Sequence, residues 1–144
     1  MIRVPQNGIR PPGIEALTKA FVQNRNLRII DLNDNTITTA AGQLASAIEK
    51  LPNLEIVNLE SSLIRTIGAI AIARGIVSHK KLHELYLGCN DMHIDGGLEV
   101  ARVVKNMSSL KVLDLNGNCF GLDGIDEIRN VLENNQFLNQ MAFR

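Results

Sequence analysis

The chain has 144 residues, about the length of one domain, with hydrophobic and charged fractions that are ordinary for a folded protein. Fifteen basic residues balance fifteen acidic ones, so the chain lacks the positive charge of proteins that wrap nucleic acid or lie on anionic membranes. Aromatic residues make up 3% with no Trp, which disfavours a base-stacking surface. We therefore expect no nucleic acid and no membrane among its partners.

The first residues do not contain the apolar run of a secretory signal, and no apolar run is long enough to span a bilayer. Two cysteines, Cys89 and Cys119, are too few for a disulfide framework. Both thiols are expected to be reduced, which is typical of cytosolic and nuclear proteins. These features favour a cytoplasmic location.

A repeated strand pattern runs along the chain. A partial copy at 2–9 is followed by four complete copies of Leu-x-x-Leu-x-Leu-x-x-Asn-x-Leu, with aliphatic or Phe exchanges. The complete copies occupy 27–37, 54–64, 82–92 and 110–120, and a second partial copy occupies 138–143. The leading leucines are 27, 28 and 28 residues apart, so each copy predicts one unit of a repeat architecture.

The stretch before each leading leucine predicts an amphipathic helix of about three turns. Aliphatic or Phe residues lie ten and six positions upstream, and a small residue lies one turn earlier. The two buried columns are Leu17, Leu44, Ile72, Val100 and Ile128, and Phe21, Ile48, Ile76, Val104 and Leu132. Charged residues occupy the opposite face, as expected of a helix with one side in water.

Together these elements predict an α/β leucine-rich-repeat solenoid of the ribonuclease-inhibitor-like type. Parallel β-strands should line the concave face and helices the convex face. Asn35, Asn90 and Asn118 fall where a buried asparagine side chain bonds unpaired backbone groups of the turn. Ser62 replaces it once, so that turn should be held less well.

We expect residues 1–144 to form a single solenoid, with partial copies at both ends, that belongs to a longer solenoid. Repeats bury their cores only against neighbours, so the two end faces should expose apolar residues and free strand edges. The residues concerned are Ile2, Val4, Leu17, Phe21, Leu132, Leu138, Met141 and Phe143. This predicts end-to-end self-association.

Motifs of enzymes are missing from the sequence. It has no phosphate-binding loop, no dinucleotide fingerprint, no His-Glu-x-x-His and no nucleophile elbow. His79, His83, His93 and Cys89 lie near one another but match no zinc spacing, and surface histidines with a packed thiol are the simpler reading. The run 31–35 lacks the glycine and closing glutamate of a calcium loop. We assign no catalytic residue, metal or cofactor, and an independent hydrolase or metal enzyme is the remote alternative.

The open face of the sheet is the candidate binding surface. If the leucines point inward, the third, fifth and seventh residues of each copy point into the concave groove. Acidic residues gather there, and the four complete strands contribute no Lys or Arg to it, which favours a basic surface of a protein partner. The candidate contacts are Asp31, Asn33, Asp34, Asn58, Glu60, Glu84, Tyr86, Asp114 and Asn116.

The sequence also resembles the Ran GTPase-activating proteins, over nearly its whole length. The resemblance is carried by 6–9, 13–17, 27–36 and 113–118, and it includes residues outside the leucine pattern such as Gln6, Asp31 and Asp34. It implies a crescent of ribonuclease-inhibitor-type repeats that accelerates GTP hydrolysis by the small GTPase Ran. The implied partner is GTP-bound Ran, and the implied place is the cytoplasmic side of the nuclear envelope.

The chain resembles only the later repeats of the family's crescent. In the family, an asparagine in the earlier repeats helps position Ran's catalytic glutamine, and no residue here matches it. The resemblance therefore implies a piece of the partner surface without the catalytic group. A generic ribonuclease-inhibitor-like scaffold for another protein is the alternative.

Overall fold

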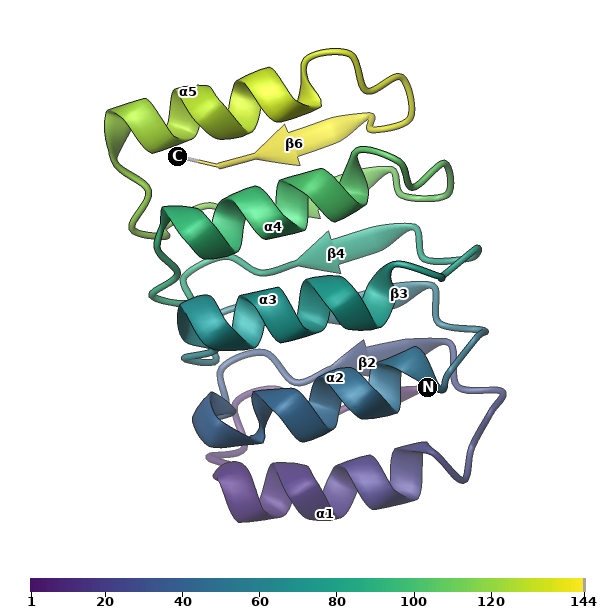
Figure 1. Ribbon diagram of the computed structural model, residues 1–144. Coiled ribbons are helices and arrows are strands. Elements are labelled where there is room, and N and C mark those ends of the chain that lie inside the picture. The colour runs from purple at the N-terminus through teal and green to yellow at the C-terminus, as the bar shows by residue number, and fades with distance from the viewer. Residues whose placement is uncertain (144) are drawn as a thin grey trace.

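The computed structural model describes residues 1–143, in which short parallel strands alternate with helices (Figure 1). A sheet of six strands runs in the order β1-β2-β3-β4-β5-β6, so each strand pairs with its neighbours in sequence. The strands are β1 (Ile2–Arg3), β2 (Ile29–Asp31), β3 (Ile56–Asn58), β4 (Glu84–Tyr86), β5 (Val112–Asp114) and β6 (Gln140–Ala142). The helices are α1 (Pro11–Phe21), α2 (Ala41–Glu49), α3 (Arg65–Ile76), α4 (Ile94–Val104) and α5 (Gly121–Leu132), and a 3₁₀ helix, η1 (Thr38–Ala40), precedes α2.

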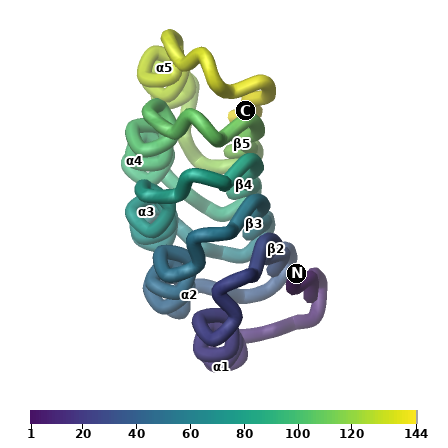
Figure 2. Tube along the Cα trace, turned by 90° about the vertical axis from the view of Figure 1, so that its right-hand side faces the viewer, coloured from purple at the N-terminus to yellow at the C-terminus, as the bar shows by residue number. Residues whose placement is uncertain are grey.

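The register of the sheet follows the repeat. Ile30 lies opposite Val57, which lies opposite Leu85 and then Leu113, so equivalent residues of successive copies stack. Strands form one layer and helices the other, and the two ends of the chain lie at opposite ends of the stack (Figure 2). The predicted α/β leucine-rich-repeat solenoid, with its strands on the concave face, is confirmed.

The core lies between the two layers and is continuous along the stack. Strand residues such as Ile30, Val57 and Leu85 are fully buried, as are the helical residues Leu44 and Ile72. Each helix contributes the aliphatic residues spaced four apart, because that spacing keeps them on one face. Hydrophobic burial between units is therefore what holds the curved stack together.

Buried asparagines close the turns after the strands, as predicted. Asn90 is fully buried, and its Oδ1 accepts hydrogen bonds from the amides of Ser62 (3.0 Å) and Ile64 (3.2 Å) in the preceding unit. Its Nδ2 donates to the carbonyls of Leu59 (2.8 Å) and Gly88 (3.0 Å). One side chain thus satisfies backbone groups of two units, and Asn35 and Asn118 make the equivalent bonds.

Ser62 supports its turn with a different set of bonds. The hydroxyl donates toward the carbonyls of Leu32 (3.1 Å) and Glu60 (2.9 Å), which replaces the donor side of an asparagine. The amide of Ile37 instead bonds the backbone carbonyl of Ser62 at 2.9 Å. The shorter side chain cannot reach that amide, so the backbone supplies the acceptor.

The five α-helices of residues 1–143 point the same way, with their N-termini at the edge where the strands end (Figure 1). None of these five has a side-chain hydrogen bond at its N-cap. Four carry a basic residue in the last turn: Lys19, Arg74, Arg102 and Arg129. A positive charge there complements the partial negative charge of the helix end.

The end faces differ from the expectation. Phe21 and Leu132 are buried, with 0% and 1% of their surface exposed. Both belong to the continuous hydrophobic core. Met141 is 44% exposed, while Ile2, Val4, Leu17, Leu138 and Phe143 are half-buried. The apolar end faces are thus smaller than predicted, and self-association stays a prediction.

Candidate functional site

The predicted candidate residues lie on the concave face, where equivalent positions of successive strands stand side by side. Residues of the strands alternate between buried and half-buried, and the half-buried ones face the groove. Asp31, Glu60, Glu84 and Asp114, hereafter the groove acids, are half-buried. The strands are about 4.8 Å apart, so their side chains shield one another. Asp34 alone of the candidate acids is exposed, after the end of β2.

Two of the groove acids, Glu60 and Asp114, approach Gly88. A Cβ built on Gly88 would lie 3.2 Å from the backbone carbonyl oxygen of Asn116, 3.3 Å from Asp114 Oδ1 and 3.6 Å from Glu60 Cγ. The space over this glycine is therefore occupied by backbone and by two acidic side chains. Asp31 lies apart, since β3 and β4 separate its strand from β5, which carries Asp114.

Tyr86 lies at the centre of this cluster. Its hydroxyl donates a hydrogen bond to Glu84 Oε2 at 2.8 Å. Burial, followed by this bond and by the negative charges of Glu84 and Asp114, raises the pKa of Tyr86 to about 12. The phenol stays protonated at neutral pH and orients the Glu84 carboxylate along the groove.

The fifth position of several strands also has a structural role. There a side-chain oxygen accepts a hydrogen bond from the backbone amide two residues on, which fixes the chain where the strand ends. The pairs are Asp31 with Asn33 (3.2 Å), Asn58 with Glu60 (3.1 Å) and Asp114 with Asn116 (2.8 Å). Asp31 and Asp114 therefore also hold the backbone at the ends of their strands.

A basic residue lies at one end of the groove and was missed by the sequence reasoning. Arg3 of β1 is in register with Asp31 and is exposed. Arg3 precedes Asp31 by 28 residues, so the repeat spacing could have predicted that Arg3 lies beside Asp31 in the groove. The groove is thus acidic along its middle strands and basic at its first strand.

The edge of the sheet where the strands begin has its own ion pair. The guanidinium of Arg28 donates two hydrogen bonds of 2.8 Å to the carboxylate of Glu55 on the next unit. This bond lowers the pKa of Glu55. Both charges are therefore satisfied locally and lie outside the acidic cluster.

The histidines and cysteines correct a second expectation. His79 is buried, 6% exposed, and its Nε2 donates to the carbonyl of Ile48 at 2.9 Å, while Nδ1 is buried without a partner. Cys89 and Cys119 are exposed free thiols. The Cys119 thiol bonds Asp91 at 3.5 Å, which raises the pKa of the thiol.

Within residues 1–143, no three or more His, Cys, Asp or Glu side chains are grouped so that they could hold a metal ion. Over the same residues, the structure contains no helix with the length and apolar character needed to cross a membrane.

Comparison with known proteins agrees with this architecture. A family model described as "Leucine Rich repeat" matches residues 23–43 and 106–128. The chain is 35% identical over 97 residues to Ran GTPase-activating protein 1 of Saccharomyces cerevisiae, which covers 64% of this chain and 24% of that protein. The chain thus spans about a quarter of the length of this curated relative.

The solved structure of "Leiomodin-1 Actin-Binding Site 2 (ABS2)" superposes with a TM-score of 0.73 at 18% identity, over 89% of this chain and 78% of the other. At this identity the likeness concerns the fold alone. The repeated strands, the buried asparagines and these likenesses agree on a leucine-rich-repeat solenoid, an architecture that serves as a protein-interaction scaffold.

Proposed function

We propose that the concave face binds a basic surface of a protein partner, and that this partner is the GTP-bound form of Ran. The observation that carries the proposal is the acidic groove of a chain without net charge, in which Glu60 and Asp114 approach Gly88 while Tyr86 bonds Glu84 and lies in the field of Asp114. The likeness to yeast Ran GTPase-activating protein 1 supports the choice of Ran over other basic partners.

In this proposal the chain supplies part of the Ran-binding surface in the cytoplasm, and none of its residues enters the chemistry. A GTPase activator speeds hydrolysis through groups placed against the transition state, beyond mere binding. The resemblance places the family's positioning asparagine in earlier repeats. Asn35, Asn90 and Asn118 are used by their turns and cannot reach a bound nucleotide.

Binding is tested with Ran loaded with GTP or with GDP, by titration at low and at moderate salt. We expect weak binding that prefers the GTP form and weakens with salt, because exposed charges are screened. Changing the groove acids together to Asn or Gln should slow association and reduce the salt dependence.

A matched control removes four charges from the convex side, where acidic residues are exposed. The residues to change are Glu49, Asp95, Glu127 and Glu133. This variant should bind Ran like the original chain. If both variants bind equally, the groove is not the interface. If neither nucleotide form of Ran binds, the alternative of a scaffold for another protein replaces the Ran assignment.

Catalysis is tested separately by single-turnover GTP hydrolysis by Ran with an excess of the chain. We expect the slow intrinsic rate to remain almost unchanged. A hundredfold acceleration, about 2.7 kcal/mol of barrier, would show that catalytic groups are present in the chain after all.

A further inference from the structure

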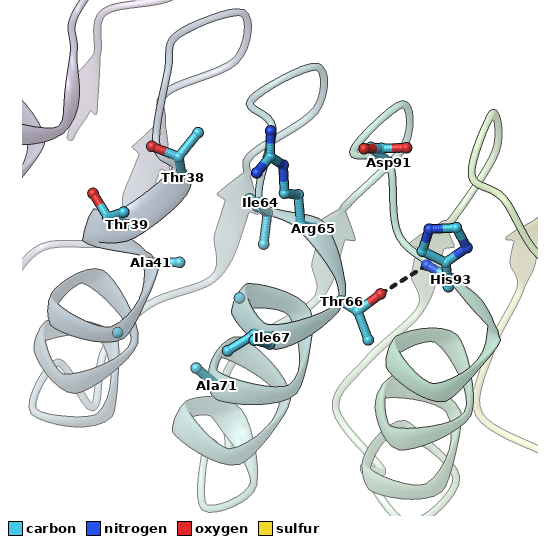
Figure 3. A pocket seen from close by; sticks show the side chains of 12 residues that line it. Thr38, Thr39, Ala41, Ile64, Arg65, Thr66, Ile67, Ala71, Asp91 and His93 are labelled. Atoms are coloured by element: carbon cyan, nitrogen blue, oxygen red, sulfur yellow. Dashed lines mark hydrogen bonds between the residues drawn. The ribbon is translucent and has the colours of Figure 1, made fainter.

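A second surface lies outside the concave face, between α2 and α3. A depression of about 530 Å³ opens there, with η1 and the start of α2 on one side and the start of α3 on the other (Figure 3). Ala41, Gly42 and Ala71 leave the space, because none of them has a side chain longer than a methyl group. Ile67 and Ala71 point from α3 toward α2 (Figure 3).

Ile67, which lines this depression, differs from the residues at the same position of the neighbouring repeats. Ile67 is 84% exposed, and the residues in register with it are Pro12, Thr39, Asp95 and Asp123. The third unit therefore places a large apolar side chain in water where its neighbours place a polar one. When a partner buries such a side chain, the binding free energy gains in proportion to the apolar area that is removed from water.

Leu63, four residues before Ile67, departs from the pattern in the same way. It is 43% exposed, and its backbone φ of 52° lies in the left-handed region, which is unfavourable for a bulky residue. Of the residues in register with it, Gly8 (φ 61°) and Asp91 (φ 55°) share this conformation and are types that tolerate it. Neither the exposed side chain nor this backbone conformation helps the fold.

The charge at the rim indicates what a partner should present. Arg65 is exposed and takes part in none of the ion pairs found among residues 1–143. Asp91, on the same rim, accepts a hydrogen bond from Cys119, while the amide of His93 donates to Thr66 Oγ1 at 3.0 Å. The unpaired cation also lies at the positive end of α3. A carboxylate complements this rim.

We infer that the depression binds a short segment of a partner protein that inserts one large apolar side chain against Ile67 and places an Asp or Glu against Arg65. This docking mode combines an apolar anchor with a single charge-assisted contact. It does not depend on the concave face or on the identity of the partner that binds there.

The test uses acetylated ten-residue peptides that carry one Trp, Phe or Leu and an Asp or Glu one to four positions later. Binding is followed by methyl chemical shifts of the isotopically labelled protein. We expect concentration-dependent shifts at Ile64 and Ile67, which line the depression, and none at Leu122, an 83% exposed leucine on α5. Peptides with Asn or Gln in place of the acid should bind at least tenfold more weakly.

Three variants complete the test. Ile67→Asp introduces the residue that two other units carry at this position, so it should fold normally and weaken peptide binding at least tenfold. Leu63→Asn changes a residue outside the lining, so it should bind the peptides as the original chain does, while its thermal midpoint rises by about 2–4 °C as the backbone strain is relieved. Leu122→Asp is the matched control and should bind as the original chain does.

Several results would overturn the inference. These are an absence of shifts at Ile67 with every peptide, equal binding of acidic and amide peptides, or unchanged binding by Ile67→Asp. Shifts at Ile67 that depend only on protein concentration would show that a second copy of this chain fills the depression instead.

Discussion

Replacing Asn90 with Ala should destabilise the solenoid strongly. The substitution deprives the amides of Ser62 and Ile64 of their acceptor and the carbonyl of Leu59 of its donor, all inside the core. The carbonyl of Gly88 keeps a bond from the amide of Ser61. Three buried groups without partners, at about 1–1.5 kcal/mol each, lower the free energy of unfolding by about 3–5 kcal/mol. That is a large share of the roughly 7–20 kcal/mol expected for this length.

Guanidinium denaturation followed by circular dichroism measures the loss, with Asn118→Ala as the comparison. Asn118 is half-buried, so water can replace part of its bonds and the loss should be about 1–2 kcal/mol. Because a solenoid can open locally, amide hydrogen exchange should also be measured at Ser62 and Ile64, where it should accelerate. A loss below about 1 kcal/mol, or one equal to that of Asn118→Ala, would refute the reasoning.

Three further predictions follow from hydrogen bonds and pKa shifts. Asp114→Ala should lower the free energy of unfolding by about 0.5–1.5 kcal/mol, whereas Asp114→Asn, which keeps an acceptor for the strand-end amide, should stay within about 0.5 kcal/mol in the same denaturation assay. Burial lowers the pKa of His79, so the unfolded chain binds its proton more readily. Stability should therefore decline as the pH falls below about 6.5, and denaturation midpoints of His79→Leu between pH 5 and 8 should lack this part of the decline. Tyr86, the single tyrosine, should ionise at a pH of about 12 in an ultraviolet titration, and Glu84→Gln should lower that value. A phenol that ionises near pH 10 in the folded protein would contradict the described geometry.

Much of the fold could be predicted because the repeat encodes it several times. The buried positions of Ile30 and Leu59 follow from the two-residue alternation of a strand, and those of Leu44 and Ile72 from the helical period. The role of Asn90 was predictable because a polar residue recurs at one point of an otherwise apolar pattern. Repetition turned weak local signals into one consistent architecture.

Features that depend on neighbouring units could not be predicted as well. The burial of Phe21 depends on how one end unit packs on the next, which no periodicity states. His79 is buried because it occupies the position that Leu51 and Met107 occupy in adjacent units. A titratable residue at that position is predicted from its type to lie on the surface. The depression beside Ile67 depends on small side chains of another helix.

The sequence predicted which residues line the concave face, but not which of them contact one another. Alternation placed Glu60 and Asp114 on the concave face, while their approach to each other depends on Gly88, where a side chain would occupy the space. The second function of Asp114, as acceptor for the amide of Asn116, depends on backbone geometry at the strand end. A pattern of residue types contains neither kind of information.

The common direction of the helices has an electrical consequence for a chain whose charges sum to zero. Basic side chains end four of the helices at one edge, whereas the groove acids lie on the strand face. Each of these full charges is larger than the half charge of a helix end, so the two groups give the molecule sides of opposite local charge. Such a protein should bind both cation and anion exchangers in dilute buffer at neutral pH, each through a different side. The electric field of an approaching charged partner would rotate this protein before the two make contact, over a distance of about 10 Å at moderate salt.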